Sequence, residues 1–195
     1  LDERFRYLFY TWSANTSQGD PAQVVIGGNI SWEFSDALAL SAGIGALPTT
    51  RTTMYTFPNW LRNDNRTVAD EYFRGSYTQG VWASGKVAPG LEYRVMLGNN
   101  LSGLGTSATE LDNMLNTVSG ALWWMPTTGE FGPINGFGDY ENHQELATLF
   151  GVNFTHSRED AQGQSPITGF ENSQIRLSDG TRLFSPQPFG TGGDV

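Results

Sequence analysis

The sequence predicts an all-β chain of long antiparallel strands, from the alternation of its residues and the length over which it alternates. From 23 to 34, every second residue belongs to one apolar or glycine series: Val24, Ile26, Gly28, Ile30, Trp32 and Phe34. Successive strand side chains point to opposite faces, so one face is apolar and the other is mostly small or polar. Strands of soluble sheets usually have ~5–6 residues, whereas strands that cross a bilayer need ~9–11, with aromatic residues near the headgroups. We therefore expect an antiparallel transmembrane β-barrel, with about eight strands in this chain.

The same alternation predicts the individual strands in order along the chain. They are expected at 4–12, 22–34, 38–48, 77–87, 91–99, 117–125 and 146–157, followed by a hairpin at 175–184 on an Asp-Gly turn. Tight turns are expected at 36–37 and at 88–90, where Pro and Gly stand in sequence. Longer connections are expected at 14–21, 49–76, 100–115 and 127–144. Short turns at one end and long loops at the other are typical of outer-membrane barrels, and only 127–144 breaks this rule.

Composition limits the functions that the chain can have. The 195 residues form one expected unit, a single barrel segment over 1–195, and the absence of cysteine excludes disulfides and thiol chemistry. The net charge of −9 disfavours nucleic acid as a partner, because neutralising phosphates needs clustered Lys and Arg. The chain enters a strand pattern almost at once and begins without a basic, apolar leader, which favours a segment of a longer protein, with a mature chain whose leader has been removed as the alternative.

Three stretches resemble one known family. The stretch from Asn65 to Ala83 is similar to the central signature of the bacterial phosphate-selective porin O and P family. Residues 91–101 and 154–160 also resemble that family, and the similarity extends over roughly 3–185. It implies a 16-stranded barrel, usually trimeric, to which this chain supplies about half of the strands.

The resemblance also implies a function. A porin of the Gram-negative outer membrane is a water-filled channel for passive diffusion of small hydrophilic solutes, among them anions such as phosphate. The expected partners are the lipid bilayer, lipopolysaccharide and two further copies in a homotrimer. Neither an enzymatic activity nor a cofactor is expected.

The connection at 49–76 is the expected pore constriction. In porins, and by resemblance here, a long loop folds into the barrel, where opposed acids and arginines set a field across the channel. The candidate constriction residues are Arg62, Asp64, Arg66, Asp70, Glu71 and Arg74. A structural role is the alternative, because Thr67 and Asp70 are spaced like a capping box and would order the loop.

Four charged residues occupy polar faces of predicted strands, namely Arg4, Arg6, Glu92 and Arg94. In a barrel this face lines the lumen, whereas on a soluble sheet it would face solvent. The expected lipid-facing residues are Ile26, Ile30, Leu38, Leu40, Ile44, Val95 and Leu97. The negative charge of the chain leaves cation preference or weak selectivity open beside phosphate preference.

Two other architectures also fit alternating strands. One is a soluble β-sandwich that binds carbohydrate through exposed aromatic residues such as Trp60 and Trp82. The other is a small eight-stranded barrel that acts as a membrane anchor, which the long connection at 49–76 disfavours because a narrow barrel has little room for it.

Overall fold

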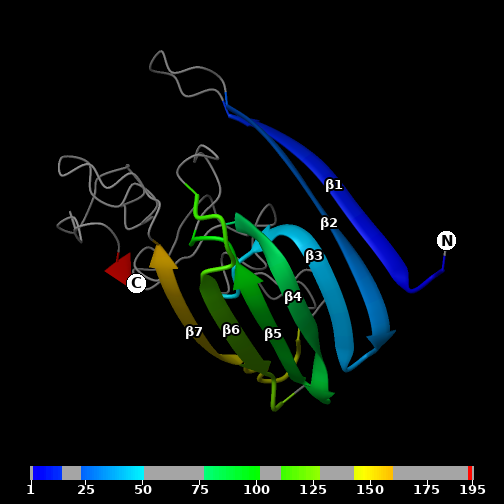
Figure 1. Ribbon diagram of the computed structural model, residues 1–195. Coiled ribbons are helices and arrows are strands. Elements are labelled where there is room, and N and C mark those ends of the chain that lie inside the picture. The colour runs from blue at the N-terminus through cyan, green and yellow to red at the C-terminus, as the bar shows by residue number, and fades with distance from the viewer. Residues whose placement is uncertain are drawn as a thin grey trace.

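The computed structural model describes residues 2–14, 23–50, 77–101, 111–127, 143–159 and 193–194. In these residues, seven long strands follow one another in one antiparallel up-and-down sheet, as Figure 1 shows. They are β1 (Phe5–Ala14), β2 (Gln23–Ser35), β3 (Leu38–Ala46), β4 (Tyr77–Ala88), β5 (Leu91–Gly98), β6 (Thr117–Trp124) and β7 (Phe150–Glu159). A short β8 (Gly193–Asp194) pairs with the end of β7. The all-β, antiparallel prediction is confirmed.

The sheet has an open edge at β1. Among the described residues, β1 pairs with β2 and with no other strand, so the sheet is not closed into a barrel. Closure is therefore a proposal rather than an observed feature. Within the same residues, no helix has the length and apolar character required to span a membrane.

One strand boundary differs clearly from the prediction. The strand expected from Leu146 begins instead at Phe150, which pairs with Trp124, the last residue of β6. The N–H of Thr148 donates to Thr127 Oγ1 at 2.9 Å, so this segment is held as a loop beyond the end of β6. β7 thus starts at the residue that pairs with the last residue of β6. The hairpin expected at 175–184 lies outside the described residues.

Tight turns and long connections leave opposite ends of the sheet, with the exception that the sequence already indicated at 127–144. Asp36–Ala37 joins β2 to β3, and Pro89–Gly90 joins β4 to β5 at the same end (Figure 1). Gly90 has a φ of +70°, a conformation that favours glycine. The connection between β6 and β7 leaves this end too, and it is long.

The pairing register sorts the side chains into two faces. One face, here called the apolar face, contains two complete rows across the seven strands. They are Phe5, Trp32, Leu40, Ala83, Val95, Gly120, Phe154 and Tyr7, Ile30, Ala42, Val81, Leu97, Val118, His156. The row between them, on the opposite or polar face, is Arg6, Ser31, Ser41, Trp82, Met96, Ser119 and Thr155.

Burial is inverted relative to a sheet that folds in water. On the apolar face, Ile30 is 51% exposed, Val95 46% and Phe154 70%. On the polar face, Met96 is 1% exposed and Ser119 0%. The buried hydrophobic cluster, formed by Leu47, Trp82 and Met96 with Leu101 packed against it, likewise lies on the polar side. The large apolar side chains, which the hydrophobic effect normally buries in a protein that folds in water, are here the exposed ones.

Candidate functional site

Short hydroxyl side chains pair with one another across the polar face. Ser31 and Ser41 lie 2.7 Å apart between β2 and β3, and Ser119 and Thr155 lie 2.7 Å apart between β6 and β7. Thr117 and Ser157 form a third pair, at 2.6 Å. Such cross-strand pairs stabilise neighbouring strands and satisfy their own donors. Thr117, Ser119 and Ser157 are fully buried, so other parts of the chain cover this portion of the polar face.

Charged groups of both signs share the polar face. Arg6 Nη2 on β1 lies 3.0 Å from Glu33 Oε2 on β2. The register pairs Glu92 on β5 with Lys86 on β4. Arg94 stacks on the ring of Trp82, with its Cζ 5.3 Å from the ring centroid, which is the geometry of a cation–π contact.

Arg4 differs from the other three predicted lumen-facing residues, because it precedes β1. Its Nη2 lies 2.9 Å from Asp2 Oδ2, and both side chains are largely exposed. The side-chain hydrogen bond from Arg4 lowers the pKa of the Asp2 carboxyl below its ordinary value. Arg4 therefore belongs to a local pair at the tight-turn end, and its lumen role remains a prediction.

The chain leaving β3 folds back over the polar face. Leu47 is fully buried against Trp82 of β4 and Met96 of β5. The carbonyl of the next residue, Pro48, accepts a hydrogen bond of 3.2 Å from Ser119 Oγ on β6. The segment Leu47–Thr49, here called the anchor segment, thus crosses two intervening strands to reach β6.

A row of glycines crosses the polar face, and one of them, Gly98, makes room for the anchor segment. Gly43, Gly80 and Gly98 are paired neighbours on β3, β4 and β5, and all belong to the polar face. A Cβ added at Gly98 would lie 3.5 Å from Leu47 Cδ2 and only 2.8 Å from Thr78 Cγ2. Without a side chain at Gly98, Leu47 can pack directly on the sheet, whereas a Cβ at Gly43 or Gly80 would meet the backbone of a neighbouring strand.

Asparagines tie together the ends of the connection between β5 and β6. The N–H of Asn100, a fully buried residue with a φ of +60°, donates to Asn116 Oδ1 at 2.6 Å. Asn116 Nδ2 donates to Asp112 Oδ2 at 2.7 Å and to the Arg158 carbonyl at 2.8 Å. The long connection is therefore clamped at its base, next to the ends of β6 and β7.

The structure describes only part of the predicted site. The constriction candidates Arg62, Asp64, Arg66, Asp70, Glu71 and Arg74 lie outside the described residues, as does all of 51–76. Of the lumen candidates, Arg6, Glu92 and Arg94 share the polar face. Trp82, expected as an exposed aromatic residue in the carbohydrate-binding alternative, is only 5% exposed because Leu47 and Met96 pack against it.

Sequence reasoning missed the anchor segment and the asparagine clamp. Leu47-Pro48 directly follows β3, and the proline predicts that the strand ends there. It does not predict that the chain then folds back over the polar face. The pair Asn99-Asn100 and the later Asn116 were a signal of polar end contacts.

No protein-family model matches the chain, and neither a curated protein nor a solved structure matches it. The two sheet faces and the anchor segment are therefore the observations from which a function is inferred.

Proposed function

We propose that the chain forms part of the wall of a porin, a water-filled β-barrel pore in a bacterial outer membrane. The observation that carries this proposal is the exposed apolar face, which extends over all seven long strands. A soluble protein rarely leaves an apolar patch of this extent in water. In a membrane barrel the same face lies against acyl chains, and the polar face lines the lumen.

Strand length and aromatic placement support the same proposal. Five of the seven strands have 9 to 13 residues, the length of a tilted crossing of the bilayer, and β5 and β6 are slightly shorter, at 8 residues. Aromatic side chains gather on the apolar face at the tight-turn end. Phe5 meets Trp32 edge-on at 6.4 Å, Trp32 stacks on Phe34 at 6.0 Å, and Trp124 contacts Phe150 at 6.0 Å. Such a girdle is typical of the level of the lipid headgroups.

The anchor segment supports a constriction formed by the following connection. Leu47 and Pro48 are held over the polar face by Trp82, Met96 and Ser119. In a closed barrel, the connection at 49–76 would therefore start inside the lumen. We assign the constriction to its charged residues, Arg62, Asp64, Arg66, Asp70, Glu71 and Arg74.

The polar face favours small hydrophilic solutes that pass by diffusion. Its paired hydroxyls are neutral, and Arg6, Arg94, Glu33 and Glu92 add charges of both signs. A preference for phosphate depends on Arg62, Arg66 and Arg74, which would offer paired N–H donors. The proposal further includes a homotrimer in a lipopolysaccharide-containing membrane, with no enzymatic activity.

The two alternative architectures fit the described residues less well. A carbohydrate-binding sandwich needs two packed sheets, but the seven long strands described here form one. A narrow eight-stranded barrel fills its interior with side chains, which leaves little space for the anchor segment.

The proposal is tested by single-channel recording of the full-length protein in planar bilayers, in potassium chloride and then in potassium phosphate. Stepwise conductance supports the pore, and its block or dominance by phosphate supports an anion-selective porin. Conductance without a phosphate effect keeps the pore and removes the phosphate preference. Absence of conductance, in a protein that stays soluble without detergent, contradicts the proposal.

A further inference from the structure

The anchor segment is attached to the sheet in two independent ways. Leu47 packs on Trp82 of β4 and Met96 of β5 through apolar contacts. Pro48 has no backbone N–H, and its carbonyl accepts the hydrogen bond from Ser119 Oγ of β6 at 3.2 Å. The first attachment holds the segment over β4 and β5, and the second holds it over β6.

The anchor segment also lies directly against the sheet. Leu47 and Pro48 are fully buried, and Thr49 is nearly so. The N–H of Thr49 donates to the Leu47 carbonyl at 2.7 Å, which folds the segment into a tight local turn. A Cβ added at Gly98 would already touch Leu47 Cδ2, at 3.5 Å, so no gap separates the segment from the strands beneath it. Because the sheet blocks one direction, a segment that is released can only move away from the sheet.

We propose that Leu47 and Ser119 are positioning residues that keep the anchor segment against the barrel wall and out of the water path of the pore. The inference rests on the proposed function, because this face has a water path only if it lines a lumen. Neither side chain has to touch a solute, since both act through the position of the segment. In a barrel, a segment that leaves the wall enters the lumen and reduces the cross-section left for water and solutes.

The two attachments can be removed one at a time. Ser119→Ala deletes the hydrogen bond to Pro48 and leaves the apolar contacts of Leu47 in place. The ratio of released to attached segment should then rise by about two- to tenfold, the factor that one buried hydrogen bond contributes to an equilibrium. Leu47→Ala should raise this ratio further, because truncating a buried leucine has a larger effect than losing one neutral hydrogen bond.

Single-channel recording of the full-length protein in planar bilayers measures this ratio. The quantity to compare is the time spent at a reduced conductance level, divided by the time spent at the full level. We expect the reduced level to be visited more often in Ser119→Ala than in the unmodified protein, and more often still in Leu47→Ala. A serine with a merely structural role would make the protein easier to unfold in urea and leave the ratio of dwell times unchanged.

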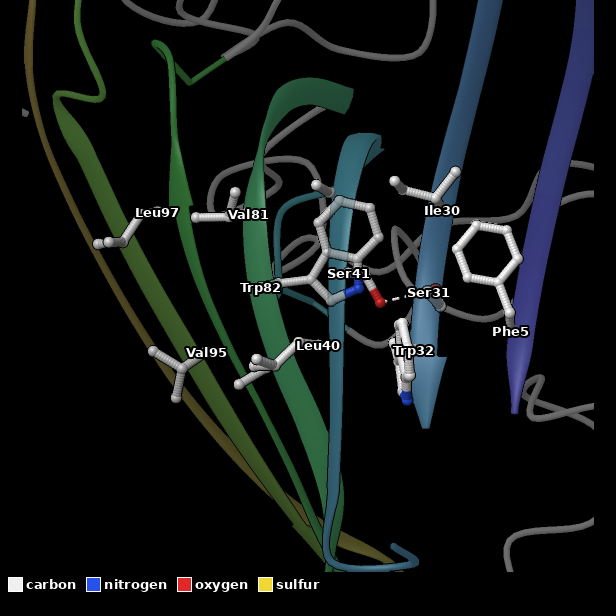
Figure 2. Close-up of a pocket in the computed structure, with 12 residues that line it drawn as sticks. Phe5, Ile30, Ser31, Trp32, Leu40, Ser41, Val81, Trp82, Val95 and Leu97 are labelled. Carbon is white, nitrogen blue, oxygen red and sulfur yellow. Dashed lines mark hydrogen bonds between the residues drawn. The ribbon is translucent and has the colours of Figure 1, made fainter. Parts of the chain in front are cut away.

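Ser31→Ala is the matched control. Ser31 lies in the same row of the polar face as Ser119. It too belongs to a cross-strand hydroxyl pair, with Ser41 at 2.7 Å, as the dashed line in Figure 2 marks. Its hydroxyl bonds Ser41 and not the anchor segment, so Ser31→Ala should have the same ratio of dwell times as the unmodified protein.

Two results would overturn the positioning role. One is a ratio of dwell times in Ser119→Ala equal to that of the unmodified protein. The other is an equal rise in Ser31→Ala, which would mean that the loss of any hydroxyl on this face disturbs the pore. If Leu47→Ala forms no channels, Ser119→Ala decides the question alone, because it deletes a single oxygen atom.

The pore is judged separately from the positioning role. An unmodified protein that conducts, with variants that conduct identically, contradicts the positioning role and leaves the pore standing. An unmodified protein without conductance contradicts the proposed function, and the positioning role is then contradicted with it.

Discussion

At the scale of single residues, Ser119 joins the anchor segment to the sheet. Its hydroxyl is fully buried, donates to the Pro48 carbonyl at 3.2 Å and lies 2.7 Å from Thr155 Oγ1. A hydroxyl has one proton, so Ser119 donates to Pro48 and accepts from Thr155. Removing the Ser119 hydroxyl would leave the Pro48 carbonyl without this donor and the Thr155 hydroxyl without this acceptor.

Ser119→Ala should therefore destabilise the full-length protein by about 1–3 kcal/mol, the usual cost of leaving buried polar groups unpaired. Urea unfolding in lipid vesicles measures this change. Thr155→Val is the control, because it removes the same hydroxyl pair but keeps the bond to Pro48. Equal destabilisation by both variants would mean that the bond to Pro48 contributes nothing.

Arg94 carries positive charge on the polar face next to Trp82. If this face lines the lumen, Arg94→Gln should make the channel more cation-selective, because a fixed positive charge attracts anions into the pore. The reversal potential under a salt gradient measures the change. Arg4→Gln makes the same change of charge at an exposed residue paired with Asp2, and it should shift the potential less. A larger shift in Arg4→Gln would contradict the placement of Arg94 in the lumen.

At the scale of one element, β5 separates the two environments most clearly. Val95 and Leu97 are exposed on the apolar face, whereas Arg94 and Met96 lie on the polar face. The strand thus exposes its aliphatic residues and covers its methionine. This order is the one expected of a strand whose apolar face lies against acyl chains, as in the proposed barrel.

In the proposed barrel, Val95→Arg should lower stability by up to about 2–4 kcal/mol, the cost of an arginine that faces acyl chains. Asn153→Arg should cost far less, because Asn153 lies in the polar-face row that contains Arg94 and Ala121. Urea unfolding in vesicles measures both variants. In a sheet that faces water on both sides, the two arginines would be tolerated equally.

At the scale of the whole molecule, the described strands have their buried cluster on the face that also carries the paired hydroxyls. Leu47, Trp82 and Met96 are covered there, while large apolar side chains on the apolar face, such as Ile30, Val95 and Phe154, remain exposed. β1 also presents an edge with no strand partner among the described residues. A bilayer does not tolerate such an edge, so closure by further pairing belongs to the proposed barrel.

The exposed face predicts that the full-length protein stays with the membrane pellet after washing in alkaline carbonate and is released only by detergent. On removal of detergent it should precipitate or form large particles in gel filtration, because water disfavours an apolar face of this size. A single sharp peak at the size of a small oligomer, in buffer without detergent, would contradict the membrane proposal.

The sequence by itself determined the all-β class, most strand boundaries and the two tight turns at Asp36–Ala37 and Pro89–Gly90. These features are local, because alternation of period two and turn residues act within a few positions. It also sorted Arg6, Glu92 and Arg94 onto one face, since the register follows the same alternation.

Only the tertiary structure decided which long-range contacts form. The bond from Ser119 to Pro48 and the clamp of Asn100 with Asn116 join residues far apart in the chain, which no local pattern specifies. The start of β7 at Phe150 depended on where β6 ends, and the burial of Trp82 depended on the path of Leu47. Alternation predicts that the faces differ, but the packing of the anchor segment decides which face is covered.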